Sequence, residues 1–247
     1  MPDPSDQSAQ ALLWSFFGAA LKSHKRESVL RPYPSFVSRQ HRDEEFEKDF
    51  DALDDLVSEV ESSSALGSSS SRLARWVTSP PRFRMQRVQT DEFARILALV
   101  GGGESKDAWP QLPTHVYRVD YSDAEQERFL ERVQQCGSLF AFHGSALCNW
   151  YSILNSGLVS ALNKTSAFGS GTYLSTELSV ALHFAASRRA PSSSRSWFGG
   201  RRLSCVAVCQ LVAGDSHLRV GKSSASGVSR SPQLPPTYLL VKKDSLV

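Results

Sequence analysis

A histidine at the end of an apolar run is the first feature suited to binding a ligand. The run from Leu139 to Phe142 ends in His143-Gly144-Ser145. The histidine can hydrogen-bond a hydroxyl group, and the glycine lets backbone N–H and C=O groups approach a flat ligand, such as an amide, without a Cβ in the way. A histidine is also a common polar residue where a strand reaches the surface. These residues alone leave both interpretations open.

A glycine-rich turn before a tyrosine is the second such feature. Residues 168–174 read Phe-Gly-Ser-Gly-Thr-Tyr-Leu, so Tyr173 begins the next predicted strand, and Phe184 follows further along the chain. Two aromatic faces can hold a flat ring between them by stacking. A lone G-x-G is weak support, because any tight turn between strands can use it. The two aromatics are equally consistent with core residues.

The cysteines do not predict a metal site. Cys136, Cys148, Cys205 and Cys209 match none of the spacings of zinc ligands. Cys205 and Cys209 fall in one predicted strand, where they share a face about 13 Å apart, too far to bind one ion together. We therefore expect four reduced thiols in a cytosolic setting, and no metal.

The first hundred residues predict helices joined by linkers. Helices are expected over residues 10–30, from Phe46 to Val60, over residues 72–79, and from an N-cap at Thr90 to the glycines at 101–103. The helix over residues 10–30 is predicted to be amphipathic. The serine tract of residues 62–71 is predicted to be flexible and unpacked.

From residue 116 onward the hydrophobic period changes. Strands are predicted over residues 116–121, 139–143, 172–175, 203–212 and 238–241, and helices over residues 124–135, 150–155 and 178–186. Residues 187–202 and 221–236 are predicted to be loops. Such irregular connections do not build regular βαβ units, so the sequence indicates an α+β fold. It predicts a helical domain over residues 1–100 and a second domain over residues 101–247.

Length and composition are those of a globular protein. The chain has 247 residues, 40% of them hydrophobic, and a formal net charge of +3. This near-balance makes no case for nucleic-acid binding by the molecule as a whole. The apolar stretch from Ala11 to Leu21 is too short to span a bilayer, and the N-terminus lacks the basic region of a signal peptide.

Several motifs together resemble a known enzyme family. FHGSALCNWYSILNSGL followed by NKTSAFGSGTYLS, and then the buried strand LSCVAVCQLV, resemble the NAD-binding core of the poly(ADP-ribose) polymerase superfamily. WSFFGAALKSHKRESVLRPYPSF and PPTYLLV are similar to its tail-anchored, endoplasmic-reticulum mono-ADP-ribosyltransferases. The resemblance covers residues 10–245. It implies an N-terminal all-helical domain followed by an ADP-ribosyltransferase-type split β-sheet catalytic domain.

The resemblance also implies which residues bind NAD. His143 would bind the adenosine-side ribose, and Gly144, next to Ser145, would hold the nicotinamide amide through its backbone. Tyr173 would stack on the nicotinamide ring, and Phe184 stands where the family usually has a second tyrosine.

Two further positions depart from the pattern of many members. Ala181 stands where many of them carry a serine that hydrogen-bonds the amide, and Tyr238 completes a His-Tyr-Tyr triad. Polymer-forming members have a glutamate at this third position, where it polarises a ribose hydroxyl for attack on another NAD. No carboxylate lies between Gly221 and Lys243. Elongation should therefore fail.

The implied function is protein mono-ADP-ribosylation with NAD as substrate and no metal. Acceptor proteins, and the chain itself, would be the partners, and no nucleic acid is expected. An inactive NAD-fold adaptor remains an alternative because of Ala181 and Phe184. An RNA-binding relative is another, because residues 72–87 and 188–202 are rich in arginine.

The C-terminus departs from the family pattern, which continues with one more strand. The sequence stops where that strand would start, so we expect a truncated catalytic domain. In the tail-anchored relatives a membrane helix follows. We expect the cytosolic face of the endoplasmic-reticulum membrane for a longer form with such a tail, and the cytosol for the chain without one.

Overall fold

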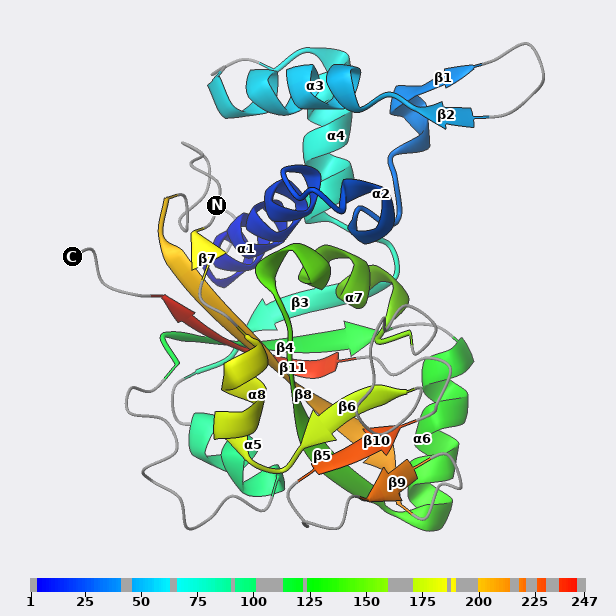
Figure 1. The fold of residues 1–247 in the computed structure, drawn as a ribbon, viewed down its shortest axis with the longest axis vertical. Coiled ribbons are helices and arrows are strands. Elements are labelled where there is room, and N and C mark those ends of the chain that lie inside the picture. Colours follow the sequence, from blue (N-terminus) through cyan, green and yellow to red (C-terminus); the bar gives the residue numbers. More distant parts are fainter. Residues whose placement is uncertain are drawn as a thin grey trace.

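The structure, a computed structural model, describes most of the chain. The described residues are 4–40, 46–62, 66–89, 92–100, 113–121, 124–159, 171–185, 188–189, 200–213, 218–220, 226–229 and 236–243. The α-helices are α1 (Pro4–Leu21), α2 (Arg26–Val29), α3 (Phe50–Ser62), α4 (Ser68–Thr78), α5 (Glu92–Leu99), α6 (Ala124–Cys136), α7 (Trp150–Ser156) and α8 (Leu178–Phe184), with short 3-10 helices η1 (Ser35–Val37) and η2 (Leu147–Asn149). The strands are β1 (Ser38–Gln40), β2 (Phe46–Lys48), β3 (Phe83–Arg87), β4 (His115–Tyr121), β5 (Ser138–Gly144), β6 (Thr172–Ser175), β7 (Arg188–Arg189), β8 (Arg202–Val212), β9 (Leu218–Val220), β10 (Ser226–Ser229) and β11 (Pro236–Lys243) (Figure 1).

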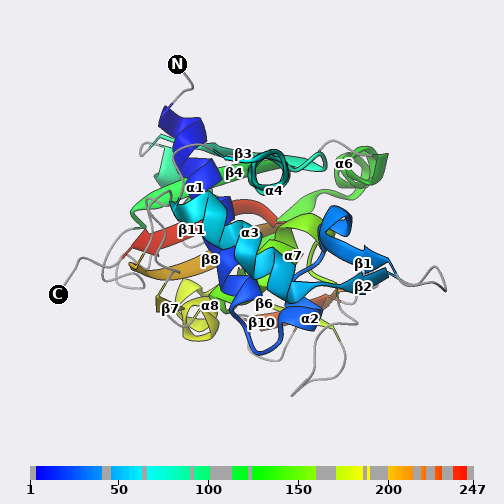
Figure 2. The same cartoon turned by 90° about the horizontal axis from the view of Figure 1, so that it is seen from above.

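Helix α1 is buried on nearly all sides. It packs against α4 on one side and against β3, η2 and α7 on the other. Helix α1 therefore lies between α4 and the sheet (Figures 1 and 2). Leu12, Phe16 and Phe17 have no exposed surface, and Trp14 on another side of the helix is only 5% exposed. The prediction of an amphipathic helix is therefore wrong, because α1 does not expose one polar face to solvent along its length. The buried hydrophobic residues of α1 all belong to one core cluster, as is typical of a helix that is buried on most of its sides.

The large sheet is antiparallel and is covered on both faces. Its strand order is β3-β4-β11-β8-β5-β6-β10-β9, with β7 on β8. Successive residues of β8 alternate between two core clusters: Cys205, Ala207 and Cys209 join the cluster that contains α1, whereas Val206 and Val208 join the one that contains residues of α5 and α8. This period of two explains why the strand reads as continuously apolar.

The sheet is split in the middle. Strand β5 pairs with β8 over its whole length, but it shares a single residue pair with β6, Phe142 with Ser175. Strands β6, β10 and β9 form the smaller part on the far side of the split. The predicted α+β class and split sheet are confirmed.

Several predictions for the first hundred residues are wrong. Residues 83–87 form β3, which pairs with β4 in the large sheet, and Phe46 begins β2 rather than a helix. The described end of the serine tract, residues 66–71, is not unpacked, because Ser70 is buried. Helix α4 begins at Ser68, because the Glu59 carboxylate accepts hydrogen bonds from Gly67 N at 3.0 Å and Ser70 Oγ at 2.8 Å. These bonds satisfy donors at the start of α4.

The predicted loops contain short strands. β7 lies within residues 187–202, and β10 lies within residues 221–236. Short polar strands lack the apolar alternation by which a strand is recognised. The predicted cap at Thr90 and the glycines at 101–103 lie outside the described residues.

The division near residue 100 stays a prediction, because one core runs across it. The cluster around α1 also contains residues of β4, β8 and β11. The Ser8 and Tyr117 hydroxyls form a buried hydrogen bond between α1 and β4. Burial raises the pKa of Tyr117 to about 12. None of the described helices is long and apolar enough to cross a membrane.

The four cysteines are free thiols in the structure. Cys205 and Cys209 are buried on one face of β8, and their burial raises the pKa of both thiols. These two thiols therefore stay protonated and serve as small apolar core residues.

Replacing Phe16 by alanine tests whether α1 is part of the common core. The Phe16→Ala change should lower the free energy of unfolding by about 3–5 kcal/mol, because it leaves a cavity among fully buried side chains. Urea unfolding followed by circular dichroism and by tryptophan fluorescence should show one shared transition. The exposed Leu130→Ala change on α6 is the matched control. A separate early transition of the helical part in Phe16→Ala would contradict a common core.

Candidate active site

His143 bridges the two parts of the sheet at the split. Beyond the Phe142–Ser175 pair the strands β5 and β6 have no further residue pair, and the Nδ1 atom of His143 lies 2.9 Å from the carbonyl oxygen of Tyr173. A carbonyl oxygen only accepts hydrogen bonds, so Nδ1 carries the proton and donates. In the neutral ring Nε2 is then left as an acceptor, a tautomer inferred from this partner.

The surroundings of His143 favour its neutral form. Burial of the ring lowers the pKa of His143 below its ordinary value, and the hydrogen bond to the Tyr173 carbonyl partly opposes this shift. The desolvation effect is the larger one, because the charged imidazolium loses its hydration. A neutral His143 can therefore accept a hydrogen bond from a hydroxyl group at Nε2.

Trp150 holds the other side of the imidazole. Its ring meets that of His143 edge to face, with centroids 6.4 Å apart, and its Nε1 donates to the Ser145 carbonyl at 3.2 Å. Phe16 of α1 packs on Trp150 with ring centroids 6.3 Å apart. Trp150 thus connects the buried N-terminal helix to the site. The sequence analysis did not single out Trp150, although it lies only seven residues after His143.

Asn149 fixes the serine next to this histidine. The Nδ2 atom of Asn149 donates to Ser145 Oγ at 2.9 Å. Asn149 is the last residue of η2, which connects β5 to α7, and Ser145 lies just before η2, so the bond spans this connection. The sequence analysis named Ser145 but not Asn149.

The structure gives Gly144 a packing reason in addition to its predicted binding role. A Cβ on Gly144 would lie 1.7 Å from the carbonyl oxygen of Ala181, well inside any permitted contact. Helix α8 therefore lies directly on the end of β5. Ala181 itself is buried, and its methyl group cannot form the hydrogen bond of the serine that many members carry there.

Tyr173, Phe184 and Tyr238 lie on the α8 side of the sheet. The strand register aligns Ser175, Phe142, Val208 and Tyr238 across four strands. Tyr238 packs against the core cluster that contains α8, and Tyr173 shares the face of Ser175 by alternation. Phe184 ends α8 and is 62% exposed, so its ring face is open to a ligand.

His143 does not share that face with Tyr238. It pairs with Ala207, the neighbour of Val208, and its ring contacts Trp150 in the cluster of α1. The structure thus brings His143 and Tyr173 into direct contact. Tyr238 lies two strands away from His143, on the opposite face. Convergence of the three residues on one ligand stays a prediction.

The family follows from comparison with known proteins. Residues 90–240 match the family model of the poly(ADP-ribose) polymerase catalytic domain, and residues 4–96 match that of the ARTD15 N-terminal domain. The chain belongs to the poly(ADP-ribose) polymerase family. This confirms the resemblance seen in the sequence, and family membership implies NAD as the substrate.

The individual relatives are mono-transferases by name. Protein mono-ADP-ribosyltransferase PARP16 of Mus musculus and of Homo sapiens is 32% identical to the chain, over 98% of the chain and 77% of the relative. Protein mono-ADP-ribosyltransferase PARP8 of Mus musculus is 25% identical, over 81% of the chain and 28% of its own length. The first similarity includes both the helical part and the split sheet.

The residues at the split fit a poly(ADP-ribose) polymerase substrate. A ribose hydroxyl needs an acceptor or donor such as the free Nε2 of His143, and a nicotinamide ring needs an open aromatic face such as that of Phe184. No cluster of His, Cys, Asp and Glu side chains suited to a metal ion occurs in the part of the chain that the structure describes.

The close contact of α8 with β5 predicts the effect of a methyl group on Gly144. The Gly144→Ala change should cost about 1–3 kcal/mol of unfolding free energy, because the backbone of α8 must move away. Leu139→Ala, at an exposed position of the same strand, is the matched control. Chemical unfolding measures both. Equal stability of Gly144→Ala and the control would show that α8 does not rest on this glycine.

The pKa of His143 predicts a specific dependence of stability on pH. Because the folded-state pKa is lowered, the unfolded chain takes up this proton first, so stability is complete above pH 6.5 and decreases as the pH falls below 6.5. A His143→Gln variant should lack this part of the acid loss. NMR titration of the imidazole gives the pKa directly. A midpoint above 6.5 would contradict the inferred burial.

Proposed function

We propose that the chain is a protein mono-ADP-ribosyltransferase. It transfers one ADP-ribose unit from NAD to side chains of acceptor proteins, including its own, and releases nicotinamide. The observation that carries the proposal is Tyr238, a residue without a carboxylate at the position where polymer-forming members have a glutamate. The relatives PARP16 and PARP8 are named as mono-transferases, which supports the same conclusion.

Each residue at the split has a proposed part in binding NAD. His143 accepts a hydrogen bond from the adenosine-side ribose at Nε2, while its bond to the Tyr173 carbonyl keeps the proton on Nδ1. The backbone of Gly144 holds the nicotinamide amide, with Ser145 beside it. Tyr173 and Phe184 stack on the nicotinamide ring. These contacts orient the bond between nicotinamide and ribose.

Bond cleavage builds positive charge on the ribose, as in the cleavage of a glycoside. The nicotinamide leaves with the bonding electron pair, and a nucleophilic side chain of the acceptor attacks C1 of the ribose and loses its proton. Tyr238 cannot act as the carboxylate base that would activate a ribose hydroxyl for a second transfer. The reaction therefore stops after one unit.

The inactive adaptor is the second candidate, and two positions favour it. Ala181 removes a hydrogen bond to the amide, and Phe184 removes a hydroxyl from the stacking residue. An adaptor would bind NAD without consuming it. Modification of acceptor proteins and of the chain itself, a location at the endoplasmic reticulum and the absence of a nucleic-acid partner all stay predictions.

Transfer of label from NAD tests the proposed reaction. Incubation of the chain with NAD labelled in the adenylate should place a label on the protein that corresponds to single ADP-ribose units by mass spectrometry. Growing chains of ADP-ribose would contradict the account of Tyr238. Binding of NAD with no transfer would establish the adaptor instead.

A His143→Ala variant tests the site itself. Loss of one ribose hydrogen bond should raise the KM for NAD about two- to twelvefold, because such a bond is worth about 0.5–1.5 kcal/mol. Leu139→Ala on the same strand should leave KM unchanged. A normal KM in His143→Ala, with the fold intact by circular dichroism, would exclude His143 as an NAD ligand.

A further inference from the structure

We propose that the outer edge of β3 binds an acidic, extended segment of a partner protein as an added strand. Three independent features of the described residues meet at this edge: an unpaired strand, a groove beside it, and an excess of arginines. The surface is separate from the residues at the split of the sheet, so the proposal does not depend on the transfer reaction.

β3 is the first strand in the order of the large sheet, and no described strand pairs with its outer side. The bond from Val88 N to Val116 O sets the hydrogen-bonding phase of the β3–β4 ladder. Alternation then directs the N–H and C=O groups of Phe83, Met85 and Arg87 away from β4. Such an edge is a template for a further strand.

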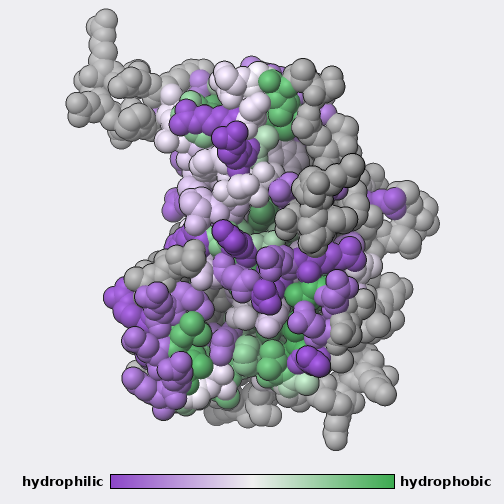
Figure 3. Space-filling model, turned by 180° about the vertical axis from the view of Figure 1, so that it is seen from behind, coloured by the Kyte–Doolittle hydropathy of each residue, from purple (hydrophilic) through white to green (hydrophobic). Residues whose placement is uncertain are grey.

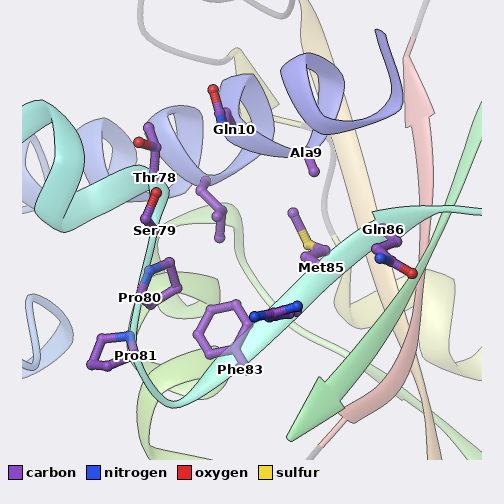
Figure 4. Close-up of a pocket in the computed structure, with 11 residues that line it drawn as sticks. Ala9, Gln10, Thr78, Ser79, Pro80, Pro81, Phe83, Met85 and Gln86 are labelled. Atoms are coloured by element: carbon purple, nitrogen blue, oxygen red, sulfur yellow. The ribbon is translucent and has the colours of Figure 1, made fainter. Parts of the chain in front are cut away.

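A groove of about 500 Å³ runs beside this edge, between α1 and β3. Ala9 and Met85 point toward one another across it (Figure 4). Both buried apolar residues, such as Leu13 and Phe83, and polar residues, such as Gln10 and Thr78, line it. The groove can therefore take a side chain of modest size from an extended chain.

The charges on and next to β3 favour an acidic partner. Arg84 and Arg87 are exposed on the strand, and Arg87, Arg95 and Arg118 line a second hollow at its C-terminal end. Arg118 donates to Asp120 at 3.0 Å, and Glu92 lines the same hollow. The charged residues named here are four arginines and two carboxylates, so this surface carries an excess of positive charge.

The surface around the strand has the expected polar character. Figure 2, the view from above, places β3 and β4 at the rear of the molecule as it is drawn in Figure 1. Figure 3 shows this rear side, and hydrophilic side chains extend across its middle. Charged side chains on an edge strand can also serve only to prevent aggregation. That alternative predicts no saturable binding of any peptide.

The geometry predicts the pattern of the bound segment. Residues paired with Phe83 and Met85 would point toward α1 and the groove, and residues paired with Arg84 and Gln86 would point to the opposite face, next to Arg118. Alternating apolar and acidic residues satisfy both faces. Blocks of the same residues do not.

The test uses a fluorescein-labelled peptide of eight residues in which valine and glutamate alternate. Fluorescence anisotropy with the full chain should show saturable binding that weakens at higher salt. A peptide of the same composition with four valines followed by four glutamates should bind at least tenfold more weakly. Absence of saturable binding, or equal binding of the two peptides, would overturn the proposal.

Backbone methylation separates strand addition from charge attraction without altering the protein. Two peptides are compared, one N-methylated at every valine and the other at every glutamate. Each loses the N–H groups of one edge of its strand, and an added strand pairs with β3 through one edge only. Only one of the two peptides should therefore lose binding. Binding by both, or by neither, would show that no strand is added. Arg84→Glu combined with Arg87→Glu should weaken the unmethylated peptide at least tenfold, whereas Lys22→Glu, an exposed charge reversal elsewhere, should not. An equal effect of both changes would overturn the proposed position.

Discussion

The burial of α1 between α4 and the large sheet is the constraint on which the rest of the structure depends. Phe16 and Phe17 contact aromatic residues of α7 directly, so the helix supplies part of the core beneath β5 and β8. Large buried aromatics contribute strongly to stability, because they remove much apolar surface from water. The helical part is thus a structural component of the sheet, whatever further role it has.

This packing extends to the residues at the split. Phe16 supports Trp150, Trp150 packs against His143, and His143 bonds to the carbonyl of Tyr173 across the split. A side chain therefore bridges the two strands just beyond the point where their backbone pairing ends. The same bond fixes which nitrogen of the imidazole is free. Stability and the predicted binding chemistry consequently rest on the same contacts.

Local patterns predicted the strands β4, β5, β6, β8 and β11, but they missed the other described strands and predicted the environment of α1 poorly. The nearly continuous apolar run in residues 203–212 and the apolar run before His143 gave β8 and β5 almost to the residue, because burial on both faces leaves a clear signal. Residues 83–87 are polar at three of five positions, and their strand depends on pairing with β4. The cap of α4 by Glu59 depends on a contact between two helices. Position in the sheet, such as the opposite faces of His143 and Tyr238, follows from register and not from sequence spacing.

A crystal structure of the chain with a non-hydrolysable NAD analogue tests the central claim most directly. We expect the nicotinamide ring between Tyr173 and Phe184 on the α8 side of the sheet, its amide on the backbone of Gly144, and a ribose hydroxyl on Nε2 of His143. Tyr238 should lie near the nicotinamide ribose without a carboxylate beside it. Two results would contradict the account. In the first, the analogue binds away from the split between β5 and β6. In the second, the analogue binds at the split, but His143 keeps its bond to the Tyr173 carbonyl and makes no contact with the analogue.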